Sequence, residues 1–354
     1  MRQLWELRRE LGQRSLSCQR LYLDQRYWND LCDATLGTGP AEAIGALSQL
    51  QRLVDQGTLI CPVEATHISE LFEQRVPAKR LATAKVMDAL STRVAIASPP
   101  DRAFLEILRF VQAAPKGPPF PAAPSAEVWT RPAFVFGHFD LPDAGDHPRA
   151  EELNWISVQT AWQSSYEELI QLHGSSPPSP YAFKLRTAVE LNESKKATRA
   201  LFKSFRKLYM SEVRGALDAI ALDTAGALAY LGTQAGIDME EVPKVQPYEG
   251  AKELAALVAA DFEDHDIGKC LPSVHVHATL VARLQWDGPR QYRPNDFPDF
   301  AHAAAGIPYC NAFATEGPLA ALITDAGLAR EFGVSVLSTW HQVTTWLETI
   351  NGAS

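Results

Sequence analysis

The chain has 354 residues, of which 46% are hydrophobic and 21% are charged, and its formal charge is −9. This composition is typical of a globular protein with an ample core, arranged as one large domain or two ordinary ones. The acidic balance argues against a protein that coats nucleic acid with its whole surface, although it leaves room for a local basic face.

The sequence has no uninterrupted apolar run of membrane-spanning length and no start typical of a signal peptide. Its five cysteines are scattered and show no Cys-x-x-Cys spacing. This pattern argues against a disulfide framework and against a structural zinc site. We therefore expect a cytoplasmic protein with no membrane partner.

Short apolar runs alternate with amphipathic helices over the first hundred residues. In chain order, the pattern predicts a leading helix over 1–19, a strand over 20–24, helices from 27 and over 41–56, a strand over 58–62, a helix that carries Glu70, a helix near 78–90 and a strand near 94–97. Strands that alternate with helices predict an α/β fold with a parallel sheet and right-handed crossovers.

This pattern breaks at two Pro-rich stretches, 114–124 and 175–180. The segments between and after them have helical periodicity, over about 151–172, 182–214, 215–236 and 249–263. We therefore expect a large helical insertion over residues 100–265. It would interrupt an α/β domain whose halves are residues 20–99 and 266–354.

The strand and helix pattern resumes near the end of the chain. A short helix begins near Asp296 and places Asp299 and His302, three residues apart, on one face. A strand-like run over 311–315 then ends in Glu316, before a last strand over 333–337 and a terminal helix around 340–350.

Acids therefore occupy matching positions along the chain. Asp24 and Glu316 end strands, while Glu70 and Asp299 lie in helices and Asp296 is a fifth candidate. Chemistry in open α/β sheets lies at the carboxyl ends of the strands, so we expect these acids to meet there. Clustered carboxylates repel one another unless a counter-charge holds them together, and Mg²⁺ or Mn²⁺ prefers oxygen ligands. Such ions activate water and stabilise charge on a phosphodiester.

Each acid also has a structural interpretation. Asp24 is placed equally well to cap a helix, and Asp296 precedes Phe-Pro as a helix N-cap would. Glu70, taken alone, is typical of a solvated helix face. His67 and His302 are better suited to orient neighbouring acids or to pack than to act as bases.

Four motifs in this order resemble the PIN-like nuclease family over about residues 20–97 and 270–338. They are Tyr22-Leu23-Asp24-x-x-x-Trp28, His67-x-x-Glu70, Asp299-x-x-His302 and Pro308-Tyr309-Cys310-Asn311-x-Phe313-x-Thr315-Glu316. The resemblance implies a three-layer α/β/α fold with three or four carboxylates that hold Mg²⁺ or Mn²⁺. Many members of the family cleave RNA, including toxins of bacterial toxin–antitoxin pairs.

By this resemblance, Asp24, Glu70, Asp299 and Glu316 would be the catalytic metal ligands. Asp296 would be a further ligand, and His67, His302 and Asn311 would support the site. The chain departs from the family pattern in three places. Gln25-Arg26 replaces the usual Thr-Asn after the first acid, Asn311 stands where relatives often have Asp, and Glu316 is longer than the usual Asp.

A basic segment stands out within this acidic chain. Residues 184–214 contain nine Lys or Arg against three Glu. At helical spacing one face would carry the following basic side chains: Lys196, Arg199, Lys203, Arg206 and Lys207. This face could bind phosphates or form an ordinary solvated surface, and the nuclease hypothesis favours nucleic acid.

His275 and His277 offer a separate metal hypothesis. A His-x-His pair at a strand end is typical of zinc-type hydrolases, but this stretch could equally begin a helix. We therefore expect an Mg²⁺- or Mn²⁺-dependent endoribonuclease, with DNA as another substrate and an antitoxin or other protein as a partner. The alternative is a non-catalytic PIN-like module that binds nucleic acid or protein.

Overall fold

The computed structural model describes residues 2–114, 126–137, 149–172, 181–198, 201–220, 247–265 and 267–351. It divides the chain into two compact units. The first unit comprises Met1–Ser98, Ser125–Pro180 and Tyr309–Ser354, and the second comprises Pro99–Pro124 and Tyr181–Pro308. Each unit is built from segments that are far apart in the sequence.

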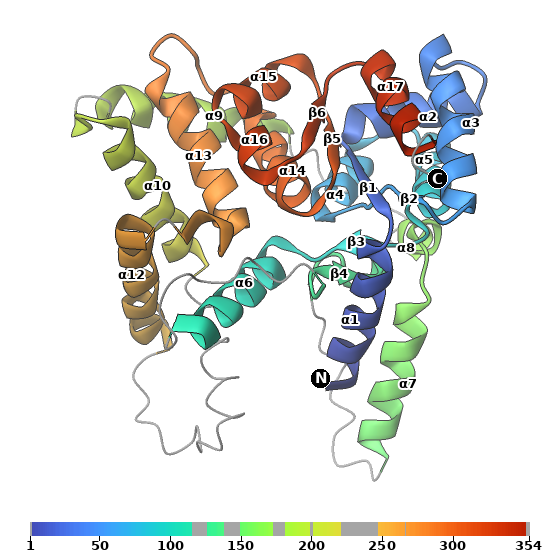
Figure 1. Cartoon of the computed structure of the whole chain (residues 1–354), viewed down its shortest axis with the longest axis horizontal. Helices are drawn as coiled ribbons and strands as arrows, with labels where there is room; N and C mark the ends of the chain where they lie inside the picture. Colours follow the sequence, from blue (N-terminus) through green and yellow to red (C-terminus); the bar gives the residue numbers. More distant parts are fainter. Residues whose placement is uncertain are drawn as a thin grey trace. The chain divides into compact units, whose positions relative to one another are not determined.

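A parallel sheet organises the first unit (Figure 1). Its strands are β1 (Gln19–Leu23), β2 (Leu59–Ile60), β5 (Ala312–Ala314) and β6 (Ser335–Leu337), in the order β2-β1-β5-β6. All three pairings are parallel. The predicted α/β class with a parallel sheet is confirmed.

A short second sheet continues beyond β2. Strand β3 (Ala95–Ile96) pairs antiparallel with β4 (Trp129–Thr130). An isolated parallel bridge joins Val63 to Ala95, so the backbone after β2 runs alongside β3. The parallel arrangement is thereby extended by one further strand.

Both faces of the four-stranded sheet are buried. Leu23 and Ala314 lie within the main apolar core, which also contains Trp28 of the following helix. Tyr22 and Phe313 lie on the opposite face, fully buried, with ring centroids 5.2 Å apart. Burial of both faces explains why the strands have few polar residues, as in other parallel sheets.

Helices connect and cover these strands. They are α1 (Arg2–Leu16), α2 (Gln25–Thr35), α3 (Ala41–Asp55), α4 (Ala65–Glu73), α5 (Pro77–Ser91), α7 (Ala150–Trp162), α8 (Tyr166–Leu172), α15 (Gly317–Asp325), α16 (Leu328–Phe332) and α17 (Trp340–Asn351), with a 3₁₀ turn at Pro132–Phe134. The helices predicted over 41–56, 78–90 and 340–350 match α3, α5 and α17.

The second unit is helical in its described parts. It contains α6 (Pro99–Ala113), α9 (Tyr181–Thr198), α10 (Phe205–Ala219), α12 (Pro247–His265), a 3₁₀ turn at Ile267–Lys269, α13 (Pro272–Trp286) and α14 (Asp296–Tyr309). Its core draws on α6, α10, α12 and α13, with Phe110, Val213, Val258 and Leu271 among its buried members. The predicted helix near Asp296 is α14.

The division into units differs from the expected insertion at 100–265. Residues 125–180 return to the first unit because β4 pairs with β3 and Tyr166 is buried there, where its hydroxyl donates to the Val94 carbonyl oxygen at 3.2 Å. Residues 266–308, expected in the α/β domain, group with the second unit. The leading helix belongs to the first unit, where Leu4 and Leu11 are buried.

Two predicted helices are interrupted. The stretch 151–172 forms α7 and α8, and 182–214 forms α9 and the start of α10. Ser204 caps α10, since its hydroxyl oxygen accepts the Lys207 N–H at 3.4 Å. Residues 115–124, 175–180 and 221–236 of the expected loops and helix lie outside the described residues. Among the described helices, none is both long and apolar enough to cross a membrane.

Candidate active site at the carboxyl edge of the sheet

Asp24 follows the last residue of β1 and is almost completely buried. Its Oδ1 accepts the backbone N–H groups of Arg26 at 3.1 Å and Tyr27 at 3.4 Å, so it caps α2. Its Oδ2 accepts the Glu316 N–H at 3.2 Å. Asp24 is therefore held by two elements at once, and the capping interpretation of its sequence position is confirmed.

Glu316 lies at the equivalent end of the neighbouring strand. It is the N-cap residue of α15 and is exposed, and no capping hydrogen bond involves its side chain. Leu23 pairs with Ala314, so Asp24 and Glu316 follow paired residues. The structure brings these two sequence-predicted acids together at the carboxyl edge of β1 and β5.

This edge coincides with the point where the strand order reverses. From β1 the chain continues to β2 on one side of the sheet, and it later returns to β5 and β6 on the other side (Figure 1). In open α/β sheets the two connections leave opposite faces at such a point and open a crevice at the carboxyl ends of the strands. Asp24 and Glu316 flank this point.

A third acid, Glu64, reaches the same edge and was not predicted. Glu64 directly follows the Val63 bridge and begins α4 as its N-cap, and its side chain is completely buried. Arg20 pairs with Ile60, and Asp24 and Glu64 lie equally far beyond that pair. The acid that follows the extended second strand is thus Glu64.

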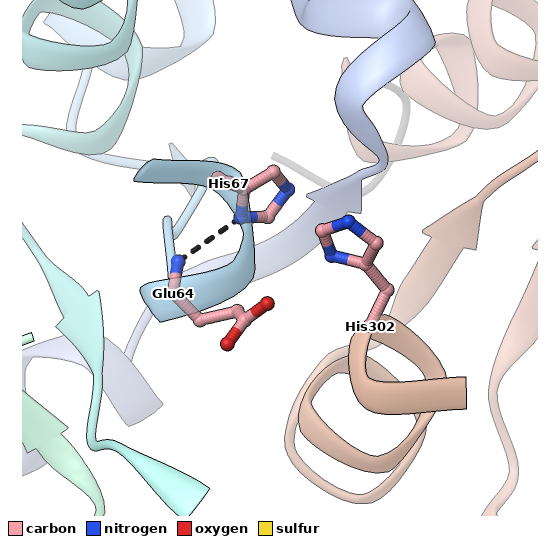
Figure 2. Close-up of side chains that lie close together, drawn as sticks. All are labelled: Glu64, His67 and His302. Atoms are coloured by element: carbon pink, nitrogen blue, oxygen red, sulfur yellow. Dashed lines mark hydrogen bonds between the residues drawn. The ribbon is translucent and has the colours of Figure 1, made fainter. Parts of the chain in front are cut away.

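His67 ties this acid to β1 (Figure 2). Its Nδ1 accepts the Glu64 N–H at 3.0 Å, and the Glu64 side chain receives the His67 backbone N–H in a reciprocal capping box. The His67 Nε2 lies 2.7 Å from the Leu23 carbonyl oxygen. Because Nδ1 accepts, Nε2 must carry the proton and donate to Leu23, which fixes a neutral tautomer. His67 therefore positions the backbone just before Asp24.

Glu64 and His67 also offer a carboxylate oxygen and a ring nitrogen within 4.8 Å of each other. Both His67 nitrogens already make hydrogen bonds, so binding a metal would cost one of them. The pair is better suited to orient the edge than to provide its main ligands. His302, drawn with them in Figure 2, belongs to α14 of the second unit.

Glu70 lies further along α4, where its side chain is half-buried. It stands almost two helical turns beyond the start of α4 at the sheet edge. Glu64, rather than Glu70, is the acid next to the ends of the strands.

Tyr27 adds a neutral polar group near these acids. Burial raises the pKa of its hydroxyl, and the charges of Asp24, Asp30 and Glu316 add to this effect while Arg26 opposes it. The hydroxyl oxygen is buried and has no hydrogen-bond partner among the described residues. Tyr27 thus stays protonated as a donor.

The remaining predicted acids belong to the second unit. Asp296 is buried at the start of α14, where its Oδ2 accepts the Arg293 N–H at 2.7 Å and its Oδ1 lies 3.4 Å from an Arg290 guanidinium nitrogen. These contacts favour the structural interpretation of Asp296. Asp299 is half-buried in the first turn of α14, and His302 is buried one turn later. Their expected roles in the metal site stay predictions.

Asn311 lies at the opposite edge of the sheet from Asp24. Its Oδ1 accepts the Arg20 N–H at 3.0 Å, and its own N–H donates to the Arg20 carbonyl oxygen at 2.8 Å. Strand β5 separates Asn311 from Glu316, and a strand rises about 3.3 Å per residue. Asn311 therefore fixes the register of β1 and β5 at the other end of the strands from Asp24 and Glu316, and its supporting role in the site stays a prediction.

The expected basic face is not a single helical face. Lys196 lies on α9, Lys203 lies in the turn before α10, and Arg206 and Lys207 lie in the first turn of α10. Arg199 lies outside the described residues. The helix break removes the spacing on which the prediction depended, although Lys203, Arg206 and Lys207 remain exposed neighbours.

The His275 and His277 pair does not form a chelating motif. Both lie in α13, and side chains two positions apart on a helix point in different directions. His275 Nδ1 lies 2.7 Å from the Tyr209 hydroxyl oxygen, whereas His277 packs near Phe297 and Phe300 and burial lowers its pKa. The strand-end zinc interpretation is wrong.

No protein-family model, curated protein or solved structure matches this chain. The resemblance to PIN-like nucleases therefore stays a prediction from the residues. At the carboxyl edge the structure provides two carboxylates at the ends of adjacent strands, of which Asp24 is fixed by hydrogen bonds and Glu316 is exposed, together with the buried Glu64 and a neutral imidazole. Such a set can bind a hard divalent cation.

Proposed function

We propose that this protein is a divalent-metal-dependent nuclease of the PIN-like type that cleaves RNA, with DNA as the less favoured substrate. One observation carries the proposal. Asp24 and Glu316 end neighbouring parallel strands on either side of the point where the strand order reverses, with Asp24 Oδ2 3.2 Å from Glu316 N. This is where open α/β sheets place their ligands.

The arrangement of the sheet supports the proposed three-layer architecture. The parallel order β2-β1-β5-β6 is extended on the β2 side by the Val63–Ala95 bridge. Both faces of the sheet are buried, as they must be when helices cover each side. A three-layer PIN-like domain has these properties, and other doubly wound folds share them.

The donor set is compatible with Mg²⁺ or Mn²⁺. The two carboxylate oxygens of Asp24 accept three backbone N–H groups, and a carboxylate has about four acceptor positions. These hydrogen bonds fix the orientation of the Asp24 carboxylate at the end of β1. The exposed Glu316 carboxylate supplies the second donor. The bound ion would activate water and stabilise negative charge on the phosphodiester.

The residues of the chain have separate roles in this proposal. Asp24 is the fixed ligand, because its hydrogen bonds leave its side chain little freedom. Glu316 is the adaptable ligand, because it is exposed and longer. His67 holds the backbone before Asp24 in place, and Glu64 places a third carboxyl group on the second-strand side of the edge. Asp299 is a further ligand by resemblance alone.

Cleavage of labelled single-stranded RNA and DNA with Mn²⁺ tests the proposal. We expect the wild type to cut RNA and to lose cutting in EDTA. Asp24→Asn and Glu316→Gln should each lower the rate by 100-fold or more, on the order of one lost charge-stabilising contact. The Asp24→Asn protein should still fold, because an Asn side chain also caps helices.

Matched variants keep the test specific. Asn311→Asp adds an acid at the other edge of the sheet and should leave the cutting rate unchanged. Glu64→Gln and Glu70→Gln compare the two candidate acids of the second-strand side, and we expect the larger loss from Glu64→Gln. Equal cutting by the wild type, Asp24→Asn and Glu316→Gln would overturn the proposal.

A non-catalytic PIN-like module is the second candidate, and the bonding of Asp24 favours it. Three backbone N–H groups on one carboxylate give Asp24 a complete structural role without any metal. In that case, purified wild-type protein would bind RNA but would not cut it with Mn²⁺ or Mg²⁺. The same cleavage experiment separates the two candidates.

A further inference from the structure

The second unit contains a pocket with aromatic walls between α10 and α13. Its volume is about 280 Å³, and it is lined by Lys195, Phe202, Leu208, Gln285 and Trp286. Pockets for drug-sized ligands begin near about 300 Å³. The pocket therefore matches a single small planar group better than a larger ligand.

Trp286 forms an accessible aromatic surface at the mouth of this pocket. It is the last residue of α13, and 44% of its surface is exposed. Phe205 packs against it edge-on, with the ring centroids 6.2 Å apart, and the Arg283 guanidinium carbon lies 4.6 Å from the Phe205 ring centroid. Phe205 therefore contacts both a cation and the indole, and these contacts hold the two aromatic rings together.

The polar groups of the pocket are fixed as well. Lys195 is buried, and its ammonium group donates to the carbonyl oxygens of Leu284 at 2.7 Å and Asp287 at 2.6 Å, and also to that of Arg290. Its charge is used at the end of α13, and its alkyl chain lines the pocket. Gln285 Nε2 donates to Glu212 Oε1 at 2.9 Å, which orients the amide.

Basic side chains flank the pocket on the α10 side. Lys203, Arg206 and Lys207 are exposed, and the segment 201–208 contains no acid. Arg206 and Lys207 lie in the first turn of α10, where cations oppose the helix dipole. Arg206 also donates to the Glu263 carbonyl oxygen at 2.5 Å, so a structural contact accounts for its position. Helix stability does not account for the position of Lys207. Asp287 is an exposed acid next to Trp286.

We propose that this pocket binds an unstacked base of single-stranded RNA, with the base on Trp286 and the adjoining phosphates near Lys203 and Lys207. Aromatic stacking platforms beside basic side chains are the usual means of holding single strands. The choice of RNA over another polyanion rests on the proposed nuclease function. The pocket itself lies within the second unit and uses none of the proposed metal ligands.

Fluorescence anisotropy of labelled oligouridine and oligoadenosine tests this site, with the full chain in EDTA. Trp286→Ala should weaken binding by about 5- to 100-fold, the usual effect of losing one base stack, while Trp286→Phe should retain most of the affinity. Blunt duplex RNA should bind equally to the wild type and Trp286→Ala, because a paired base cannot enter the pocket.

The lysines are tested through the salt dependence of binding. Replacing Lys203 and Lys207 with Ala should reduce the slope of log affinity against log salt by about 1.4, or 0.7 for each lost phosphate contact on a single strand. The control replaces the exposed Lys85 and Lys269 with Ala, which removes the same charge and should leave the slope unchanged.

Three outcomes would overturn the inference. The first is that Trp286→Ala binds RNA as tightly as the wild type. The second is that both pairs of lysine substitutions reduce RNA affinity and its salt dependence equally. The third is that an acidic peptide displaces RNA and binds less tightly to Trp286→Ala than to the wild type. The last would assign the pocket to a peptide. The Asp24→Asn variant serves as the control that separates the two sites. If it no longer cleaves RNA but binds RNA with wild-type affinity, a failure of the nuclease site is distinguished from a failure of this pocket.

Discussion

The two ends of the parallel strands carry side chains of opposite charge. At the amino edge, Arg20 donates to the carbonyl oxygens of Tyr309 at 2.9 Å, Ser15 at 3.2 Å, Leu16 at 3.1 Å and Cys18 at 2.9 Å. At the carboxyl edge, Asp24 accepts from backbone N–H groups, and a second acid, Glu316, stays exposed beside it.

The difference follows from the backbone groups at each edge, which are carbonyl groups at the amino edge and N–H groups at the carboxyl edge. Arg20 satisfies carbonyl groups at the end of α1 and in the turn after it, so its donors are used within the fold. At the carboxyl edge the N–H groups of α2 and α15 attract negative charge, and the sequence provides more acid than those groups require. The amino edge has a structural role, and the carboxyl edge keeps an exposed acid, Glu316.

Removing Arg20 should have the largest effect on stability. Arg20→Ala would leave several buried or half-buried carbonyl groups without a donor, and we expect a loss of about 3 kcal/mol in the free energy of unfolding. Urea denaturation followed by circular dichroism measures it. Arg52→Ala, an exposed arginine on α3, should change the free energy by less than about 0.5 kcal/mol.

Raising the pH should lower the free energy of unfolding through a group at each edge, and the loss should begin at a different pH for each. At the amino edge, burial raises the pKa of the Cys310 thiol to about 12, although Arg20 opposes the shift. Since an unfolded thiol ionises near pH 8.5, the native state holds more protons above that pH, and stability falls as pH rises. The loss is about 1.4 kcal/mol per pH unit for each such group.

Cys310→Ala should therefore make stability fall less steeply between about pH 9 and about pH 11, by about 2 kcal/mol in total. Tyr27→Phe, at the carboxyl edge, should make stability fall less steeply only above about pH 10, where an unfolded tyrosine ionises. Denaturation at each pH measures both, and the values at pH 7 give the cavity cost to subtract. Identical onset for the two variants would contradict the assignment.

Asp24 should contribute to stability mainly as a cap. Asp24→Ala removes the acceptor for α2 and should cost about 1–2 kcal/mol, whereas Asp24→Asn should cost less than about 1 kcal/mol. Thermal unfolding compares the two. Equal losses from the Asn and Ala variants, which both lack the charge, would show that the charge, rather than the acceptor, stabilises this end of β1.

Asn311 should give the smallest effect. Asn311→Ala removes one hydrogen bond to the Arg20 N–H and should cost about 1 kcal/mol. Denaturation midpoints measure this loss, and the cleavage assay should show no change for the same variant. Loss of cleavage in a stably folded Asn311→Ala protein would place Asn311 in the chemistry after all.

Local patterns predicted the elements of the sheet and the acids Asp24 and Glu316. Each of these acids directly follows an apolar run, and the end of a strand can be read from a few residues. Glu64 occupies the equivalent position after the second strand, but it was missed. Strand β2 itself comprises only Leu59–Ile60, and the backbone reaches Glu64 through the Val63 bridge to Ala95, which a local pattern does not reveal. A capping position occupied by Glu, three residues before His67, was the available signal.

Other features depended on interactions that a local pattern does not contain. The position of Asn311 follows from the register between β1 and β5, which are almost three hundred residues apart. The return of residues 125–180 to the first unit follows from the pairing of β4 with β3. The break between α9 and α10 had a local signal, since Ser204 is a good N-cap, but continuous helical periodicity obscured it.

The three carbonyl groups around Lys195 have a chemical consequence. Lys195 and Lys196 are adjacent in the sequence, yet the first is buried and hydrogen-bonded while the second is exposed. An amine-reactive reagent should therefore modify Lys196 quickly and Lys195 only when the end of α13 opens. The ratio of the two modifications, read by mass spectrometry of one peptide, would report the opening of the second unit with its own internal standard.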